Sequence, residues 1–334
     1  MVGSSAAFAT ASIERHLRQQ LASDRARLRF DRARRFVDQA LAAASDDALA
    51  QTLNARWLKF LCGQAPVQND IGPDAADVLR RFAADFGLPP AERRRFTGLS
   101  LLGWLWRAWS LQPLLQGPAA TVARLTHVVG AEHFDRGRQH AAGLILLPVH
   151  GQFSRLLQPY FRHRGHDGLE LGITGDKLEQ QGVQTSAQKQ MELARQMHAA
   201  KRALDRGGIV FNLPDARQNL DNARTVEFFG RERPLAAGFA ELALRTGAQV
   251  VPMAYRFSPR GFFVLEFGAP LRIGGPEQAH GVRVDSLVDQ YADFLRDQWR
   301  RYPWNIPWPH LHHYCQLPAA VAGAINPRAQ ALPQ

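Results

Sequence analysis

Two polar residues follow apolar runs and could take part in proton transfer. His150 follows LILLPV at 144–149, and Asp215 follows IVFNLP at 209–214. In open α/β sheets, catalytic groups gather beyond the carboxyl ends of the strands. Histidine is the side chain best matched to proton transfer near neutral pH, and a helix that begins after His150 would direct backbone N–H groups to the same edge. We therefore take His150 as a candidate general base, in preference to a core histidine.

The elements that must position these residues form an α/β pattern, in which short apolar runs alternate with helical periodicity. This pattern predicts a mixed, mostly parallel sheet flanked by helices. A helix with an apolar stripe of Met191, Ala194, Met197 and Leu204 is expected to end at a glycine pair. The expected strands are 143–149, 169–174, 209–214, 248–257 and a hairpin partner at 262–268, and the expected helices are 153–165, 187–208 and 237–247.

Three regions are expected along the chain. Residues 1–117 have helical periodicity and include a tryptophan-rich segment at 97–117, which is compatible with a membrane interface and equally with a buried helix. Residues 118–315 carry the α/β pattern, and 316–334 form a tail without strong periodicity that we expect to be poorly ordered. The first fifteen residues do not resemble a signal peptide, and no run of roughly 20 apolar residues is present to span a bilayer.

Composition limits the partners. The chain has 334 residues, a net charge of +11 and two distant cysteines, which indicates a reducing, cytoplasmic compartment and no disulfide scaffold. A basic surface attracts nucleic acid, anionic lipid headgroups or an acidic carrier protein. Because no nucleic-acid recognition module is visible, we do not expect nucleic acid as a partner, and peripheral contact with an anionic inner membrane remains open.

Other motifs carry less chemical information. The sequence HLHH supplies His310, His312 and His313, but no carboxylate or cysteine stands at matched spacing, so no metal site is predicted. GITGDK at 172–177 lacks the spacing of a phosphate-binding loop. The motif Gly-x-Ser-x-Gly is absent, which argues against an α/β-hydrolase nucleophile, and Ser154 is a weaker alternative nucleophile.

Five successive motifs between 143 and 270 carry a family resemblance. They are the apolar strand with His150, GGIVFNLPD with Asp215, VEFFGRERP, the helix and strand AAGFAELALRTGAQVVP, and MAYRF with Arg256. This stretch resembles the lauroyl/myristoyl acyltransferases of lipid A biosynthesis and, more widely, the lysophospholipid acyltransferase superfamily. The C-terminal YPWNIPWPHLHHY is similar to the family's Trp- and His-containing ending. The resemblance implies a glycerolipid acyltransferase-like fold.

Two features depart from the family pattern. The family has an acidic residue five positions after the histidine, where this chain has Arg155. The family's amino-terminal transmembrane helix is replaced by a helical region and the tryptophan-rich segment.

The resemblance implies direct acyl transfer from an acyl carrier protein or coenzyme A thioester to a hydroxyl or amine acceptor, without a cofactor. His150 would deprotonate the acceptor, and donors nearby would stabilise the oxyanion. Arg155, with its planar fork, is suited to a phosphate or carboxylate. We predict His150 and Asp215 as catalytic residues and, as substrate-binding residues, Arg155, Gln152, Phe228, Phe229, Gly230 and Arg256.

Three explanations for the missing acid remain open. Another carboxylate, with Asp215, Asp176 and Glu227 as candidates, orients His150 from a different direction. Alternatively, the acceptor is intrinsically nucleophilic, such as an amine or hydrazine, so that a weak base suffices. In the third explanation, the protein is a catalytically inactive homologue that binds lipid or acyl carrier.

Overall fold

A computed structural model describes the α/β region and one helix that precedes it. The tail beyond 317, the residues before 75 and nearly all of the tryptophan-rich segment 97–117 lie outside the described residues, so the expectations for them stay predictions. The structure describes residues 75–89, 119–171, 186–215, 222–258 and 262–317, together with Ser100, Arg107, Leu111, Leu114 and Leu115.

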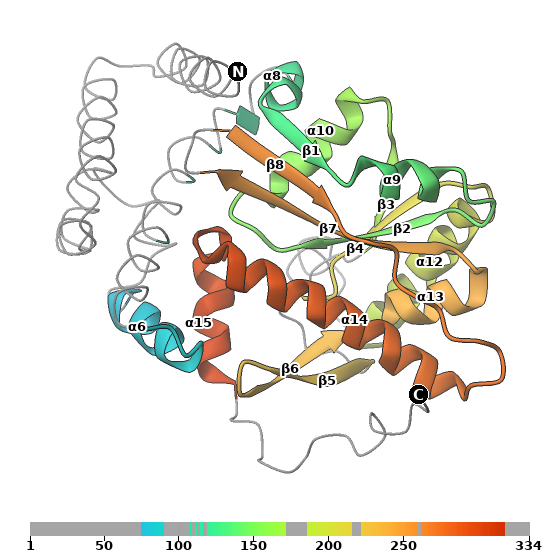
Figure 1. The fold of residues 1–334 in the computed structure, drawn as a ribbon. Helices are drawn as coiled ribbons and strands as arrows, with labels where there is room; N and C mark the ends of the chain where they lie inside the picture. Colours follow the sequence, from blue (N-terminus) through green and yellow to red (C-terminus); the bar gives the residue numbers. More distant parts are fainter. Residues whose placement is uncertain are drawn as a thin grey trace.

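A six-stranded mixed sheet forms the centre of the described fold, in the order β1-β8-β7-β2-β4-β3 (Figure 1). Four of the neighbouring pairs are parallel, and the pair β7–β8 is an antiparallel hairpin. The predicted mixed, mostly parallel sheet is therefore confirmed. Its strands are β1 (Thr126–Val129), β2 (Leu144–Val149), β3 (Gly168–Leu171), β4 (Ile209–Asn212), β7 (Gln249–Ser258) and β8 (Phe262–Phe267).

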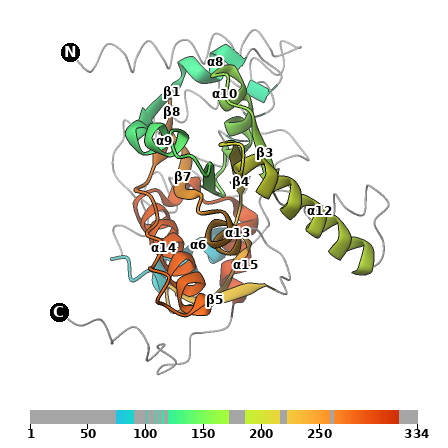
Figure 2. The ribbon, with the colours of Figure 1, turned by 90° about the vertical axis from the view of Figure 1, so that its right-hand side faces the viewer.

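Helices cover both faces of this sheet, and a two-stranded antiparallel sheet lies beside it (Figures 1 and 2). The two strands of that second sheet are β5 (Ala223–Phe228) and β6 (Arg231–Ala236). The α-helices are α6 (Ala75–Asp85), α8 (Ala119–Arg124), α9 (Ala131–Arg138), α10 (Leu157–His163), α12 (Ser186–Leu204), α13 (Gly238–Thr246), α14 (His280–Arg301) and α15 (Trp308–Gln316), and the 3-10 helices are η1 (Ser154–Leu156) and η2 (Pro303–Asn305).

The central strand β2 is buried along its whole length, as expected for a parallel strand covered on both faces. Because successive side chains point to opposite faces, Leu144 and Leu146 join one hydrophobic core, and Ile145, Leu147 and Val149 join the other. The first core contains residues of α8, α9 and α10, and the second contains residues of α6, α12, α13, α14 and α15. This alternation fixes the strand so that its carboxyl end delivers His150 at the edge of the sheet.

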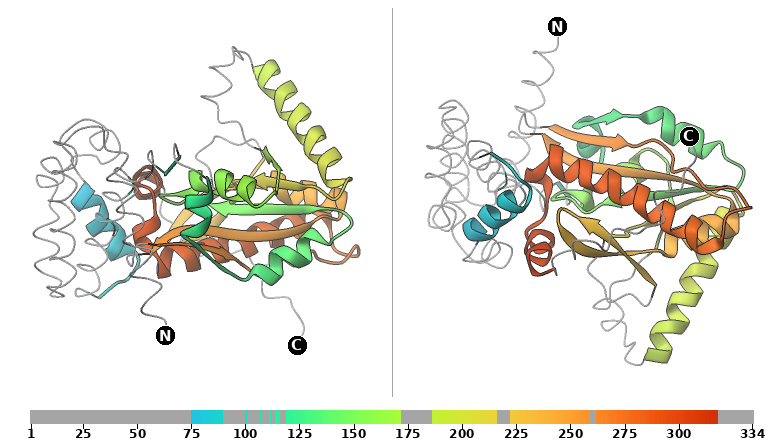
Figure 3. Two further views of the ribbon diagram at one scale, coloured as in Figure 1. Left: turned by 90° about the horizontal axis from the view of Figure 1, so that it is seen from above. Right: turned by 60° about the horizontal axis from the view of Figure 1, so that its bottom comes forward.

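The predicted strands and helices from 143 to 268 are confirmed wherever the structure describes them, with ends shifted by a few residues. The expected apolar stripe of α12 is wrong at Met191, which is 67% exposed, and at Ala194, which is also exposed, whereas Met197 and Leu204 pack with the core. Figure 3 shows this helix projecting away from the sheet. Strand β1, the β5–β6 hairpin and helix α14 are additional elements. No helix within the described ranges is both long enough and apolar enough to cross a membrane.

Candidate active site

His150 and Asp215 meet at the carboxyl edge of the sheet. Strands β2 and β4 are parallel neighbours, with Leu144 opposite Ile209 in register, so their carboxyl ends lie side by side. His150 is the first residue after β2, and a short turn after β4 brings Asp215 next to it, 65 residues away in sequence. The sequence-based expectation of polar groups at two strand ends therefore corresponds to one location.

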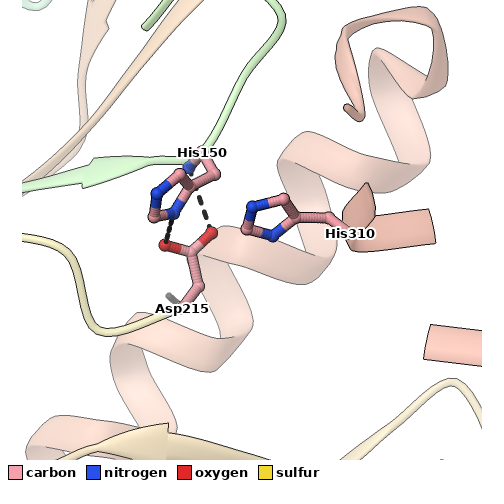
Figure 4. A group of neighbouring side chains, drawn as sticks. All are labelled: His150, Asp215 and His310. Atoms are coloured by element: carbon pink, nitrogen blue, oxygen red, sulfur yellow. Dashed lines mark hydrogen bonds and ion pairs between the residues drawn. The ribbon is translucent and has the colours of Figure 1, made fainter. Parts of the chain in front are cut away.

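The Asp215 carboxylate holds His150 through both of its oxygens (Figure 4). Oδ1 lies 2.7 Å from Nδ1 of the imidazole, and Oδ2 accepts the backbone N–H of His150 at 3.0 Å. The Asp215 side chain is fully buried, whereas the His150 side chain is 25% exposed. The ring is thus fixed from its buried side and remains accessible from solvent.

The charge state of Asp215 decides the tautomer of His150. Burial raises the pKa of Asp215, but the charge and hydrogen bond of His150, together with the charges of His310 and Arg233, lower it more strongly, so the pKa lies well below its ordinary value. An ionised carboxylate can only accept hydrogen bonds, and Nδ1 must therefore carry the proton that it donates to Oδ1. The lone pair of the neutral ring is then on Nε2, which is the arrangement that a general base needs.

Arg233 supplies a buried positive charge behind this pair. It comes from β6, is 4% exposed, and its guanidinium lies 4.6 Å from the ring centre of Phe228 and 4.8 Å from that of Trp299. Its Nη1 has no hydrogen-bond partner among the residues that the structure describes. Burial lowers the pKa of Arg233 and the charge of Asp215 raises it, with a net lowering. The two buried charges have opposite signs and attract each other, so Arg233 helps to keep Asp215 ionised.

The segment after His150 is clamped by the C-terminal part of the chain. The backbone N–H and side-chain amide of Gln152 donate to the carbonyls of Asn305 and Ile306, both at 2.9 Å. The Asn305 side chain in turn bonds to both backbone groups of Phe257 at the end of β7. Gln152, predicted to bind substrate, is buried and used in this clamp, so its visible role is to hold the His150 loop in place.

Gly151 lies close to the backbone of β7. A Cβ atom at this position would be 2.9 Å from the backbone oxygen of Tyr255, which is closer than real Cβ contacts allow. The sequence after His150 therefore requires glycine for lack of space. The N–H groups of Gln152 and Ser154 donate to the carbonyls of Asn305 and Gly151, so these two groups do not serve as the oxyanion donors expected at the helix start.

A second histidine, His310, stands beside the pair. It belongs to α15, and its ring centre is 4.4 Å from that of His150, with 31° between the ring planes. One donor atom from each of His150, Asp215 and His310 lies within 4.8 Å of the others. His312, two residues later, instead contacts the ring of Trp308 at 5.6 Å. Of these two histidines of the HLHH motif, His310 lies at the candidate site.

Arg155 does not take the place of an orienting acid. It lies in η1 and is exposed, whereas Asp215 contacts His150 from the turn that follows β4. The Ser154 hydroxyl donates to the Gly151 carbonyl at 3.1 Å. Of the other candidate acids, Glu227 accepts the N–H of Gly230 at 2.6 Å, and Asp176 lies outside the described residues.

The predicted substrate-binding residues Phe228, Phe229 and Gly230 form the end of the β5–β6 hairpin. Phe229 and Gly230 have φ of 52° and 76°, the signs that a two-residue type I′ turn requires. Phe229 tolerates this because its ring stacks on Phe86 at 3.7 Å and its carbonyl accepts the Tyr314 hydroxyl at 2.7 Å. Phe228 is fully buried against Trp299. Substrate binding by these three residues stays a prediction.

Arg256, also predicted to bind substrate, is half of an ion pair in the β7–β8 hairpin. Its guanidinium lies 3.0 Å from Glu266 and 3.7 Å from the ring centre of Tyr302. Nε of Arg256 is buried and has no hydrogen-bond partner in the described part of the chain. These contacts account for the presence of the arginine in structural terms.

Three residues important to this geometry were not identified from the sequence in these roles: Arg233, Asn305 and, as a neighbour of the pair, His310. A buried arginine between aromatic rings has no distinct local pattern, because the two rings come from β5 and α14. His310 was noted only within HLHH. The one sequence feature that could have indicated His310 as a site residue is the position of HLHH close to the end of the predicted α/β domain.

Comparison with known proteins places the chain in a family. The family model described as bacterial lipid A biosynthesis acyltransferase matches residues 114–290. Among solved structures, the 1-acyl-sn-glycerophosphate acyltransferase of Thermotoga maritima matches with 14% identity and a TM-score of 0.30, covering 66% of this chain and 96% of that chain. None of the curated proteins matches. Because the family model covers more than half of the sequence, the chain belongs to the bacterial lipid A biosynthesis acyltransferase family.

Proposed function

We propose that this acyltransferase moves an acyl group from a thioester to a hydroxyl or amine acceptor, with His150 as the general base and Asp215 as the acid that orients it. The observation that carries this proposal is the two-point contact between His150 and the buried Asp215 carboxylate, at 2.7 and 3.0 Å. It favours the explanation in which a different carboxylate takes over from the missing family acid. The Asp215 carboxylate reaches the ring from the turn after β4 instead of from the helix that follows β2.

The proposed reaction uses the lone pair on Nε2 of His150. Nε2 takes the proton of the acceptor O–H or N–H while the acceptor atom attacks the thioester carbonyl carbon. The tetrahedral intermediate then collapses, the C–S bond breaks, and the imidazolium returns its proton to the departing sulfur. The products are an ester or amide and a free thiol. Asp215 stabilises the imidazolium between the two proton transfers, as the carboxylate of a catalytic triad does.

The buried surroundings of Asp215 support this assignment. A carboxylate without exposed atoms keeps its interaction with an adjacent cation strong, because water does not screen it. The charge and hydrogen bond of His150, and to a smaller extent the charges of His310 and Arg233, outweigh burial and keep the pKa of Asp215 well below its ordinary value. A weak, solvent-exposed base that relies on a very nucleophilic acceptor is therefore not required, although an amine acceptor remains compatible with the site.

The donor is proposed to be an acyl carrier protein or coenzyme A thioester. The net charge of +11 suits an acidic carrier or the phosphates of coenzyme A. Arg155 is exposed five residues after His150, where a guanidinium fork is suited to a phosphate or carboxylate of donor or acceptor. Phe228, Phe229, Gly230 and Arg256 are proposed substrate contacts by family resemblance. Contact with an anionic membrane surface is a further proposal from charge.

The test is a thiol-release assay on the purified full chain. Acyl carrier protein and coenzyme A thioesters are each offered with a panel of alcohols and amines, and free thiol and acylated product are measured together. We expect acceptor-dependent thiol release that His150→Ala reduces by at least about 10²-fold, the usual contribution of general-base catalysis. Absence of turnover with all donors, or turnover that His150→Ala leaves unchanged, would support the inactive lipid- or carrier-binding homologue instead.

A further inference from the structure

Three side chains with metal-binding atoms converge at the edge of the sheet. His150 and Asp215 follow β2 and β4, and His310 lies in α15 (Figure 4). One donor atom of each lies within 4.8 Å of the others. In the sequence, His310 stands 160 and 95 residues from its two neighbours, a spacing that no metal-binding motif would suggest. The carboxylate that HLHH lacks locally is thus provided by Asp215.

The donor set has the chemistry of a zinc-type site. Two imidazole nitrogens and one carboxylate oxygen are common protein ligands of Zn²⁺, which binds them at about 2.0–2.2 Å and leaves a fourth position for water. At those lengths, tetrahedral ligand atoms stand roughly 3.4 Å apart. The observed separations, from 2.7 Å for Nδ1 of His150 and Oδ1 of Asp215 up to 4.8 Å, span this value. The three donor atoms are therefore close to the spacing that a bound ion needs.

The surroundings permit entry but limit affinity. His150 and His310 are both partly exposed, so an ion can approach from solvent, while Asp215 is held at the bottom of the cluster. The buried guanidinium of Arg233 interacts with the same carboxylate and opposes an added positive charge. We expect reversible binding that chelators can undo, in contrast to a permanent structural ion.

We propose that these three residues bind a divalent ion of the zinc class, and that the ion inhibits the enzyme by displacing the proton that joins His150 to Asp215. One nitrogen of each imidazole and one oxygen of the carboxylate would coordinate the ion, and the displaced proton is released to solvent. His150 bound in this way cannot be oriented by Asp215 for proton abstraction. The binding stands on the geometry alone, and only the inhibition rests on the proposed function.

The binding test uses the full chain without a histidine tag. Zn²⁺ is titrated by calorimetry, and Co²⁺ is followed by its visible absorption, whose intensity reports four-coordinate geometry. We expect one ion per chain, and at least about tenfold weaker binding in His310→Ala and Asp215→Asn, since even loss of an outer partner costs 10- to 100-fold. His312→Ala is the matched control on the same helix and should bind like the wild type. Absence of binding, or equal binding by His310→Ala, would overturn the proposal.

The inhibition test adds Zn²⁺ to the thiol-release assay. Inhibition should be reversed by a chelator, and the inhibitory concentration should rise at least about tenfold in His310→Ala, measured relative to that variant's own activity. Inhibition of both proteins at the same concentration would refute a role for His310. If zinc binds as expected but no thioester is turned over, the metal site stands and the proposed function fails; if turnover occurs and zinc does not bind, only the metal site fails.

Discussion

Replacing Asp215 by asparagine removes the negative charge beside His150 and keeps the size of the side chain. The carboxylate accepts two hydrogen bonds, from Nδ1–H and from the backbone N–H of His150. An amide has one acceptor oxygen and one donor NH₂ group, so it can accept only one of these two hydrogen bonds. If NH₂ faces the ring, it donates to Nδ1 and moves the ring proton to Nε2, where the base is needed.

The expected loss follows from these contacts. A hydrogen bond to a charged group contributes about 1.5–3 kcal/mol, and the imidazolium also loses the adjacent negative charge. Together we expect roughly 3–5 kcal/mol, which is about 10²- to 10⁴-fold in kcat/KM. The loss of the corresponding aspartate charge in a serine-protease triad is of about 10⁴-fold, at the upper end of this range.

The assay is steady-state thiol release from the best thioester donor, with Glu227→Gln as the matched control. Glu227 was a candidate for the same role by sequence, but its carboxylate binds Gly230 in the hairpin turn, so this variant should keep near-normal kcat/KM. A less than about threefold effect of Asp215→Asn, corresponding to under roughly 0.7 kcal/mol, would refute the reasoning. So would a large loss in Glu227→Gln with Asp215→Asn unaffected.

The same substitution should change the pH dependence of stability. The pKa of Asp215 is lower in the folded protein than the ordinary value of about 3.9, so its ionisation stabilises the fold fully above about pH 4. This contribution is lost as the pH falls toward the lowered pKa. Asp215→Asn should therefore show a shallower loss of unfolding free energy below pH 4 in denaturant titrations. Parallel wild-type and variant curves would contradict the assignment.

Three further substitutions test the support of the site. Arg233→Met removes the buried cation, so the pKa of Asp215 should rise, the loss of unfolding free energy in acid should begin at higher pH, and stability should fall by roughly 2–4 kcal/mol; an unchanged pH profile of stability would exclude this role. Gly151→Ala places a Cβ atom 2.9 Å from the backbone oxygen of Tyr255, so it should destabilise the protein by about 1–3 kcal/mol and reduce activity. The control is Gly281→Ala in α14, where a Cβ atom meets no described atom within 4 Å and should stabilise by roughly 0.5–1 kcal/mol. Equal shifts of the melting temperature in the two variants would contradict the crowding at Gly151. Gly230→Ala meets no atom within 4 Å, but its φ of 76° should cost about 1–2 kcal/mol in chemical denaturation, and no loss would show that the turn relaxes.

The elements around the site were largely predictable because their signals are local. Strand β2 is apolar throughout since both of its faces are covered, and the hairpin β7–β8 has its turn between two apolar runs. The β5–β6 hairpin was harder to recognise, because its turn uses Phe229 at a positive φ where asparagine or glycine is usual. That conformation depends on stacking against Phe86 and on the hydroxyl of Tyr314, which are distant in sequence.

The sequence by itself determined that His150 and Asp215 each stand at a strand end, since buried apolar runs followed by a polar residue are a local pattern. Tertiary structure alone decided that β2 and β4 are neighbours, and hence that Asp215, among three candidate acids, contacts His150. It also brought His310 and Arg233 to the same carboxylate. Strand order and helix packing depend on the burial of surfaces far apart in the chain, and local periodicity carries no information about which partners meet.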